Sequence, residues 1–229
     1  MLRGMNPKQR AAEAAITLLH NDMVVGLGTG STADYFLQAL AAAIGDGRLR
    51  GIRGIPTSRQ SERRANELGI PLVTFVQRPT ADLTVDGADE IDPQLNLIKG
   101  LGGALLREKI VAQNSHQLVI IADAGKEVHT LGTKGPLPIE VTAFGHELQE
   151  GFLRSLGSEP VLRRDAAGEI FITDNGNVIY DCRFPRIDNP AALERTLQQR
   201  AGIVESGLFV NLAKVAFVAD EHGVRQRMR

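Results

Sequence analysis

The stretch MVVGLGTGST, residues 23–32, decides the fold class. Its first five residues, Met23–Leu27, form a short apolar run that is typical of a buried strand. The glycines that follow lead into a helix predicted over 31–44. A buried strand that passes through a glycine turn into a helix is the first part of a β-α-β unit, and such units build parallel sheets.

The same alternation of strand and helix patterns continues through the first two-thirds of the chain. Further strands are predicted over 52–55, 71–76, 82–85 and 117–122, and a last one over 215–219 returns to them. Helices are predicted over 8–20, from Ser58 or Ser61 to Gly69, and over 102–114. This order predicts an α/β fold with an open, mostly parallel, Rossmann-like sheet and helices on both faces.

The pattern changes after about residue 133. Strands over 137–141, 160–164, 169–173 and 178–184 follow each other with turn signals between the last three, which indicates antiparallel hairpins. Helices are predicted over 145–156 and from Asn189-Pro190 to Gly202. We therefore expect a catalytic α/β domain, 1–132 with 204–229, and a smaller α+β, ferredoxin-like domain at 133–203 that could form an oligomer interface.

Composition excludes several classes of protein. The 229 residues carry 26 basic and 27 acidic side chains, so no strong field attracts nucleic acid or a membrane surface. The one cysteine, Cys182, lies in an alternating apolar run, which favours a packed strand residue over a nucleophile. A chain that cannot form an internal disulfide and shows no signal peptide fits the cytoplasm. The arginines at 225, 227 and 229 are expected to be solvated charges on a frayed end.

The glycine loop fails two nucleotide-binding patterns. The dinucleotide fingerprint requires a glycine where Ser31 stands and an acid at the end of the second strand, where the chain reads Ile55-Pro56-Thr57. A Walker loop requires a lysine before Ser31. A single phosphate at the start of the helix remains possible, with hydroxyl donors from Thr29, Ser31 and Thr32, and the alternative is a tight turn with a helix cap.

A second group of chemically active residues follows the 82–85 strand. Asp86 and Asp89 come at its carboxyl end, where active sites of open α/β sheets lie. Lys99 opens a glycine-rich segment ten residues later, and Glu108 lies in the next helix. The pattern offers an acid, a base and a cation, although each residue could instead be a turn cap or a solvated surface charge.

No cofactor or metal is expected. The five histidines lack the H-x-H or H-x-x-x-H spacing of metal ligands. A magnesium ion held by carboxylates, which would allow a hydride shift, is the mechanistic alternative.

On these motifs the sequence resembles the A-type ribose-5-phosphate isomerases. The matching segments occur in order along most of the chain: GLGTGST at 26–32, DGADEID at 86–92, KGLGGA at 99–104, REKI at 107–110, DAGK at 123–126, LPIEV at 137–141 and TDNGN at 173–177. The resemblance implies interconversion of ribose 5-phosphate and ribulose 5-phosphate through an enediolate, in the non-oxidative pentose phosphate pathway.

The resemblance also implies roles for residues. Glu108 would be the base that carries a proton between C1 and C2, Asp86 would assist ring opening, and Asp89 with Lys99 would position hydroxyls and stabilise the enediolate oxygen. The implied substrate-binding residues are Lys8, Thr29, Gly30, Ser31, Thr32, Gly87, Ala88, Gly100, Leu101, Gly102 and Lys126.

One residue departs from the family pattern, because Leu101 stands where many members have a glycine. The spacing from Lys99 to Glu108 is kept, so the loop geometry is expected to survive.

The resemblance implies a homodimer or homotetramer acting on a small sugar phosphate. The alternatives are a related sugar-phosphate deaminase and a non-catalytic sugar-phosphate sensor; a sensor would normally carry a basic DNA-binding module, which is not evident.

Overall fold

The computed structural model describes residues 6–229, which form two compact units. Unit 1 contains the described residues up to Ala88, together with Arg107–Lys126 and Asn211–Arg229. Unit 2 contains Asp89–Leu106 and Glu127–Val210. Among residues 6–229, no helix has the length and apolar character needed to span a bilayer.

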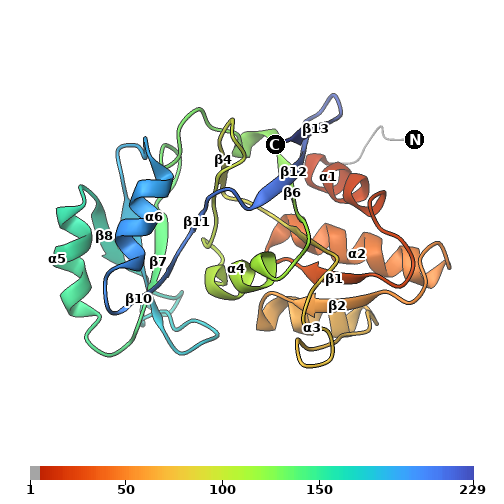
Figure 1. The fold of residues 1–229 in the computed structure, drawn as a ribbon, viewed down its shortest axis with the longest axis horizontal. Coiled ribbons are helices and arrows are strands. Elements are labelled where there is room, and N and C mark those ends of the chain that lie inside the picture. Colours follow the sequence, from red (N-terminus) through yellow and green to blue (C-terminus); the bar gives the residue numbers. More distant parts are fainter. Residues whose placement is uncertain (1–5) are drawn as a thin grey trace. The chain divides into compact units, whose positions relative to one another are not determined.

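Unit 1 is built on a six-stranded sheet of order β13-β12-β6-β3-β1-β2 (Figure 1). The neighbouring pairs from β2 to β12 are parallel, and only β13 runs antiparallel to β12. The mostly parallel sheet confirms the predicted fold class. The strands are β1 (Val24–Leu27), β2 (Arg53–Pro56), β3 (Leu83–Asp86), β6 (Leu118–Asp123), β12 (Ala213–Ala219) and β13 (Val224–Met228).

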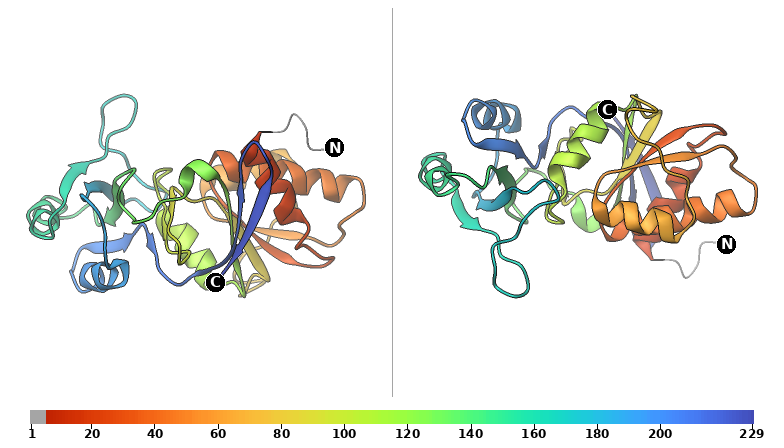
Figure 2. Two further views of the ribbon diagram at one scale, coloured as in Figure 1. Left: turned by 90° about the horizontal axis from the view of Figure 1, so that it is seen from above. Right: turned by 90° about the horizontal axis from the view of Figure 1, so that it is seen from below.

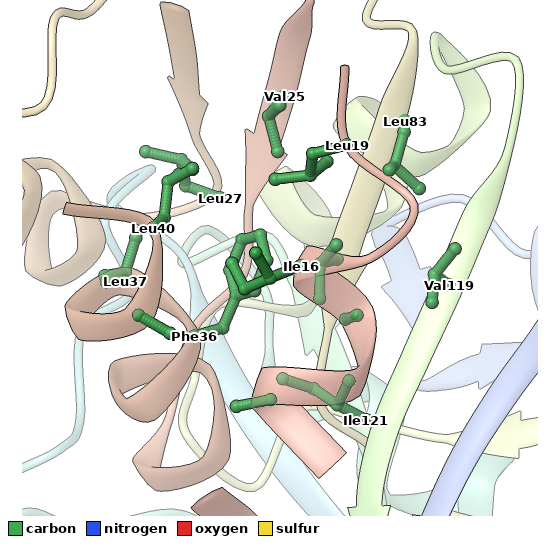
Figure 3. Close-up of a cluster of buried hydrophobic side chains, with 14 of the residues drawn as sticks. Ile16, Leu19, Val25, Leu27, Phe36, Leu37, Leu40, Leu83, Val119 and Ile121 are labelled. Atoms are coloured by element: carbon green, nitrogen blue, oxygen red, sulfur yellow. The ribbon is translucent and has the colours of Figure 1, made fainter. Parts of the chain in front are cut away.

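Helices cover both faces of this sheet, as predicted. They are α1 (Pro7–Ile16), α2 (Ser31–Gly45), α3 (Arg59–Glu67) and α4 (Leu105–Gln113), of which α4 belongs to unit 1 from Arg107 on. Side chains of α1 and α2, such as Ile16 and Phe36, pack with Val25 and Leu27 in one core cluster (Figure 3). The alternate residues of the strands, such as Val24, point to the opposite face of the sheet. There they pack with Val111 of α4 in a second cluster.

Unit 2 contains a four-stranded antiparallel sheet of order β10-β7-β9-β8. Two helices connect its strands in a β-α-β-β-α-β order, which is the ferredoxin-like arrangement that the sequence predicts. The elements are β7 (Leu137–Val141), α5 (Glu147–Ser155), β8 (Glu159–Leu162), β9 (Val178–Arg183), α6 (Pro190–Gln198) and β10 (Ile203–Ser206). Asn189 caps α6 through its side chain, and Pro190 begins the helix.

A three-stranded sheet, β11-β5-β4, also lies in unit 2. Its strands are β4 (Glu90–Ile91), β5 (Leu97–Ile98) and β11 (Leu208–Phe209). The carboxylate of Glu90 accepts hydrogen bonds from the N–H groups of Gly132, Lys134 and Gly135. These contacts join 89–106 to residues beyond 127, so the units do not follow the predicted domain boundaries.

Three predictions of local structure were wrong. Residues 71–76 make only an isolated parallel bridge between Leu72 and Gly54, because 74–78 make a turn in which the Arg78 N–H donates to the Thr74 carbonyl. Residues 169–173 make only an isolated bridge between Ile170 and Arg164. The arginine-rich end is not frayed: β13 pairs with β12 as a hairpin, drawn in blue in Figure 2. The β13 backbone forms hydrogen bonds with the edge of β12, while Arg225 is exposed and Arg227 is partly buried.

Candidate active site

The order of the strands places a crevice beside β1. The chain passes from β1 to β2 on one side and later to β3 on the other, so the sheet changes direction between β1 and β3. Ligands of open α/β sheets bind at the carboxyl ends of the strands at such a switch point. The residues predicted for the site lie at these strand ends: 29–32 come shortly after β1, and 86–88 begin with the last residue of β3.

These two segments are in direct contact. The Gly28 N–H donates to the Val85 carbonyl at 3.0 Å, and Asp86 Oδ1 accepts from the N–H groups of Thr29 at 3.1 Å and Gly87 at 2.7 Å. Asp86 is buried. A Cβ atom on Gly28 would lie 2.3 Å from Asp86 Oδ1, so only glycine allows this approach.

The start of α2 is suited to bind a phosphate. Its N-cap residue, Gly30, has a φ of 103° and provides no side-chain cap, so the helix begins without a side chain over its positive end. Lys8 Nζ donates to Ser31 Oγ at 2.8 Å, which brings a cation to the same place. The structure thus places Lys8, Gly30 and Ser31 together, as the resemblance implied.

The hydroxyl of Thr29 faces elsewhere. Its Oγ1 lies 2.8 Å from Thr57 Oγ1 and 2.8 Å from Ser58 Oγ. Ser58 caps α3 in a capping box with Ser61. Thr29 therefore ties the loop to α3 through its side chain, and its predicted role as a hydroxyl donor to phosphate is not apparent in this arrangement.

A pocket of about 380 Å³ opens beside the loop. One wall is formed by 28–31, and the other by α3 side chains that include Gln60 and Arg63. Arg64, also in this wall, pairs with Asp34 at 2.6 Å.

The predicted base, Glu108, lies in the first turn of α4 and is only 4% exposed. Val111 packs against Gly26, where a Cβ atom would lie 2.8 Å from Val111 Cγ1. Because α4 leads into the amino end of β6, its first turn points toward the carboxyl edge of the sheet. Glu108 is one helical turn before Val111, about 4.5 Å farther toward that edge at 1.5 Å per residue. Lys126 ends a short 3₁₀ helix directly after β6, at the same edge.

In unit 2 the structure brings Asp89, Lys99 and Leu101 together. Asp89 and Lys99 flank the Glu90–Ile98 pair of the β4–β5 ladder, and the Asp89 N–H donates to the Ile98 carbonyl at 2.8 Å. Asp89 Oδ2 accepts from the Leu101 N–H at 3.0 Å. Lys99 is 3% exposed, and its Nζ lies 5.5 Å from the centre of the Phe209 ring.

The backbone explains why Leu101 is tolerated. Within the glycine-rich segment, Gly100 has a φ of 104° and Gly103 a φ of 82°, a region that favours glycine. Leu101 and Gly102 lie outside that region. The departure from the family pattern therefore falls where the loop geometry does not require glycine.

The five acids between 82 and 92 have a common structural role that the sequence did not reveal. Every one of them accepts hydrogen bonds from main-chain N–H groups, so each fixes a turn or a strand end. For Glu90 and Asp92 this role accounts for their burial. The acceptors are Asp82, Asp86, Asp89, Glu90 and Asp92.

Cys182 is a buried strand residue in the core of unit 2, as predicted. Burial raises the pKa of its thiol to about 12, so the nucleophilic thiolate is scarce at neutral pH. Within 6–229, the His, Cys, Asp and Glu side chains form no group of three or more with metal-binding geometry.

Sequence reasoning missed one residue that contacts the predicted site. Arg163 Nη1 donates to the carbonyls of Gly100 at 3.1 Å and Leu101 at 3.2 Å. The sequence could not have identified this arginine. It is 62 residues from Leu101, and nothing in the local sequence distinguishes it from the adjacent Arg164.

Comparisons with known proteins agree with this arrangement. The family model of ribose 5-phosphate isomerase A (phosphoriboisomerase A) matches residues 53–223. Ribose-5-phosphate isomerase A of Roseiflexus sp. (strain RS-1) is 50% identical over 217 residues, 95% of this chain and 93% of the relative. The protein of the same name from Gloeobacter violaceus is 51% identical over 218 residues, 95% and 94% of the two chains.

Solved structures show the same similarity over the whole fold. A D-ribose-5-phosphate isomerase in complex with phospho-erythronic acid has a TM-score of 0.95 and 39% identity, covering 98% of this chain and all of the other. Ribose 5-phosphate isomerase from Plasmodium falciparum has a TM-score of 0.93 and 40% identity, covering 97% of each chain. The sensor and deaminase alternatives are not favoured. The chain belongs to the ribose 5-phosphate isomerase A family and is an aldose–ketose isomerase that acts on ribose 5-phosphate.

Proposed function

We propose that Glu108 is the general base of this isomerisation. The base removes the C2 proton of open-chain ribose 5-phosphate, and the electron pair moves through an enediolate to O1. Returning the proton to C1, with transfer of the O2 proton to O1, completes ribulose 5-phosphate. The observation that supports Glu108 is its burial in the first turn of α4, since a carboxylate shielded from water keeps the abstracted proton from exchanging with solvent.

Three further residues complete the proposed chemistry. Asp86 assists opening of the furanose ring, and Asp89 orients the substrate hydroxyls. Lys99 stabilises the negative oxygen of the enediolate, since a desolvated ammonium group interacts strongly with developing charge. No cofactor is needed for these steps.

The proposed phosphate site is the uncapped start of α2. Gly30, Ser31 and Thr32 supply N–H or hydroxyl donors, and Lys8 and Lys126 supply positive charge. The remaining proposed contacts with the sugar come from the loops that carry the catalytic residues, and they are Thr29, Gly87, Ala88, Gly100, Leu101 and Gly102.

The deciding experiment compares the wild type with Glu108→Gln after EDTA treatment, using conversion of ribose 5-phosphate to ribulose 5-phosphate. We expect metal-independent wild-type activity and a kcat about 10³-fold lower in Glu108→Gln, since general base catalysis contributes about 10²–10⁴. Glu62→Gln is the matched control, because Glu62 also lies in the first turn of a helix but is exposed. Full activity of Glu108→Gln would assign the base to another residue, with Asp86 next.

The phosphate site has its own test. Binding of the unreactive phosphate supplies free energy that orients the reacting carbons. Unphosphorylated ribose should therefore react far more slowly than ribose 5-phosphate. Equal turnover of the two sugars would contradict the phosphate site and leave the assignment of the base intact.

We also propose that the protein is a cytoplasmic homodimer or homotetramer, with the interface provided by the segment 133–203 within unit 2. Phe144 and Leu148 support this, being 96% and 72% exposed in that segment. Light scattering of Phe144→Ser with Leu148→Ser should show smaller particles than the wild type. Unchanged particle size would place the interface elsewhere.

A further inference from the structure

Arg163 holds the loop that follows Lys99, and its own position is fixed by a second residue. Its guanidinium makes a bidentate pair with Asp181, with Nε–Oδ2 at 2.8 Å and Nη2–Oδ1 at 2.5 Å. The two side chains are only 11% and 23% exposed, so solvent screens this pair weakly. The planar group also stacks on Phe171, 5.6 Å from the ring centre. All of these residues belong to unit 2.

The remaining nitrogen of Arg163 points to the loop. Nη1 donates to the carbonyl oxygens of Gly100 and Leu101. The Gly100 carbonyl belongs to the peptide group between Gly100 and Leu101. The N–H of the same peptide group, that of Leu101, donates to Asp89. One peptide unit, between Gly100 and Leu101, is therefore held at its nitrogen by a carboxylate and at its oxygen by the guanidinium, together with the Gly103 N–H at 2.9 Å.

This double attachment matters because Gly100 has little conformational preference of its own. With a φ of 104° and no side chain, Gly100 allows the peptide plane to rotate unless both ends are held. A rotation would release Asp89 on one side. On the other side it would strain the main chain of Lys99, whose N–H is held by the Gly207 carbonyl at 2.9 Å. Gly103 lies against the same support, since a Cβ atom there would be 2.5 Å from Phe171 Cζ.

We propose that Arg163, fixed by Asp181, is a positioning residue for the isomerase reaction. It fixes the Gly100–Leu101 peptide and thereby the placement of Lys99 and Asp89 toward the reacting oxygens. A lysine cannot replace it, because one ammonium group lacks the planar fork that binds a carboxylate and two carbonyls together. The inference rests on the proposed roles of Lys99 and Asp89.

The test measures kcat and KM of Arg163→Lys and Arg163→Ala. We expect kcat to fall about 10-fold in the lysine variant and up to about 100-fold in the alanine variant, because small displacements of catalytic groups have effects of this size. KM should change by less than about threefold, because binding depends largely on the phosphate site. Arg164→Ala is the control, since that side chain donates only to the nearby Gly168 carbonyl.

Two further measurements separate positioning from a general loss of stability. Guanidinium chloride at low millimolar concentration should restore part of the kcat of Arg163→Ala, whereas sodium chloride should not. Adding Asp181→Asn to Arg163→Ala should lower kcat no further, because Asp181 acts through the arginine. Thermal unfolding of each variant establishes that the protein assayed is folded.

The outcomes distinguish this inference from the proposed function on which it rests. If Lys99→Met loses activity while folded Arg163→Lys and Arg163→Ala keep wild-type kcat, the positioning role is wrong and the catalytic role of Lys99 stands. If Lys99→Met keeps wild-type kcat, the proposed function of Lys99 fails, and the positioning role that depends on it fails as well. A lowered kcat that guanidinium does not restore would also overturn the positioning role.

Discussion

The two glycine-rich loops of this protein, residues 26–32 and 99–104, are held in different ways. The first loop is fixed to the neighbouring strand β3: the Gly28 N–H donates to the Val85 carbonyl, and the Thr29 N–H donates to the Asp86 carboxylate. The second loop has main-chain hydrogen bonds at Lys99 and Gly103, and two side chains add to them, with Asp89 on one side and Arg163 on the other. In the first loop Gly28 is needed for close approach to Asp86, and in the second loop Gly100 and Gly103 are needed for a positive φ.

This difference shows which parts of a site can be predicted from a sequence. A loop fixed by neighbouring parallel strands depends on local patterns, so its place follows once the strand order is known. A loop fixed by a distant arginine depends on a contact between residues more than 60 positions apart. Three substitutions sharpen the comparison, and we give them from the largest expected effect to the smallest.

Gly28→Ala should have the largest effect. The new Cβ would lie 2.3 Å from Asp86 Oδ1 and 2.6 Å from Asp86 Cα, and β3 cannot retreat because it is paired on both sides. We expect a loss of unfolding free energy of about 1–3 kcal/mol from overpacking. We also expect kcat/KM to fall at least about 100-fold, because Asp86 is displaced.

Denaturant unfolding and steady-state kinetics measure these two effects. Gly45→Ala is the control, because Gly45 ends α2 with no atom near its added Cβ. It should be neutral or slightly stabilising. A Gly28→Ala protein as active as the control would mean that the first loop does not depend on close approach to Asp86.

The first loop, the parallel sheet and the antiparallel strands and helices of unit 2 up to α6 were predictable because each depends on local periodicity and turn residues, whereas β10 was not predicted. The wrong predictions depend on backbone hydrogen bonds that residue types do not specify, such as those of the 74–78 turn and of the β12–β13 hairpin. The arginines of β13 indicate a solvated tail, and only the exposed edge of β12 makes that segment a strand. The acids Glu90 and Asp92 lie in the same segment as the predicted Asp86 and Asp89, and only the structure shows that they accept hydrogen bonds from main-chain N–H groups.

Gly103→Ala should have an intermediate effect. The residue has a φ of 82°, and the added Cβ would lie 2.5 Å from Phe171 Cζ. A phenylalanine ring can shift, so we expect kcat to fall about 10-fold as the support of the loop is displaced. Gly168→Ala is matched, because its φ is 84° with no atom within 4 Å of its added Cβ.

Both variants place an alanine at nearly the same positive φ. Each should therefore lose about 1–2 kcal/mol of unfolding free energy to the left-handed conformation. Their difference in kcat therefore isolates the contact with Phe171. If Gly168→Ala lowers kcat as much as Gly103→Ala, backbone strain in unit 2 explains both, and the second loop has no special dependence on this support.

Leu101→Gly should have the smallest effect, and it tests the comparison most directly. The hydrogen bonds of Leu101 to Asp89 and Arg163 come from its N–H and carbonyl, which glycine keeps. Its side chain is 44% exposed, and its φ does not require glycine. We expect kcat/KM within about twofold of the wild type, since the added backbone freedom costs only about 0.5–1 kcal/mol. A loss above tenfold would show that the leucine side chain takes part in binding, and the second loop would then be held by more than its two polar supports.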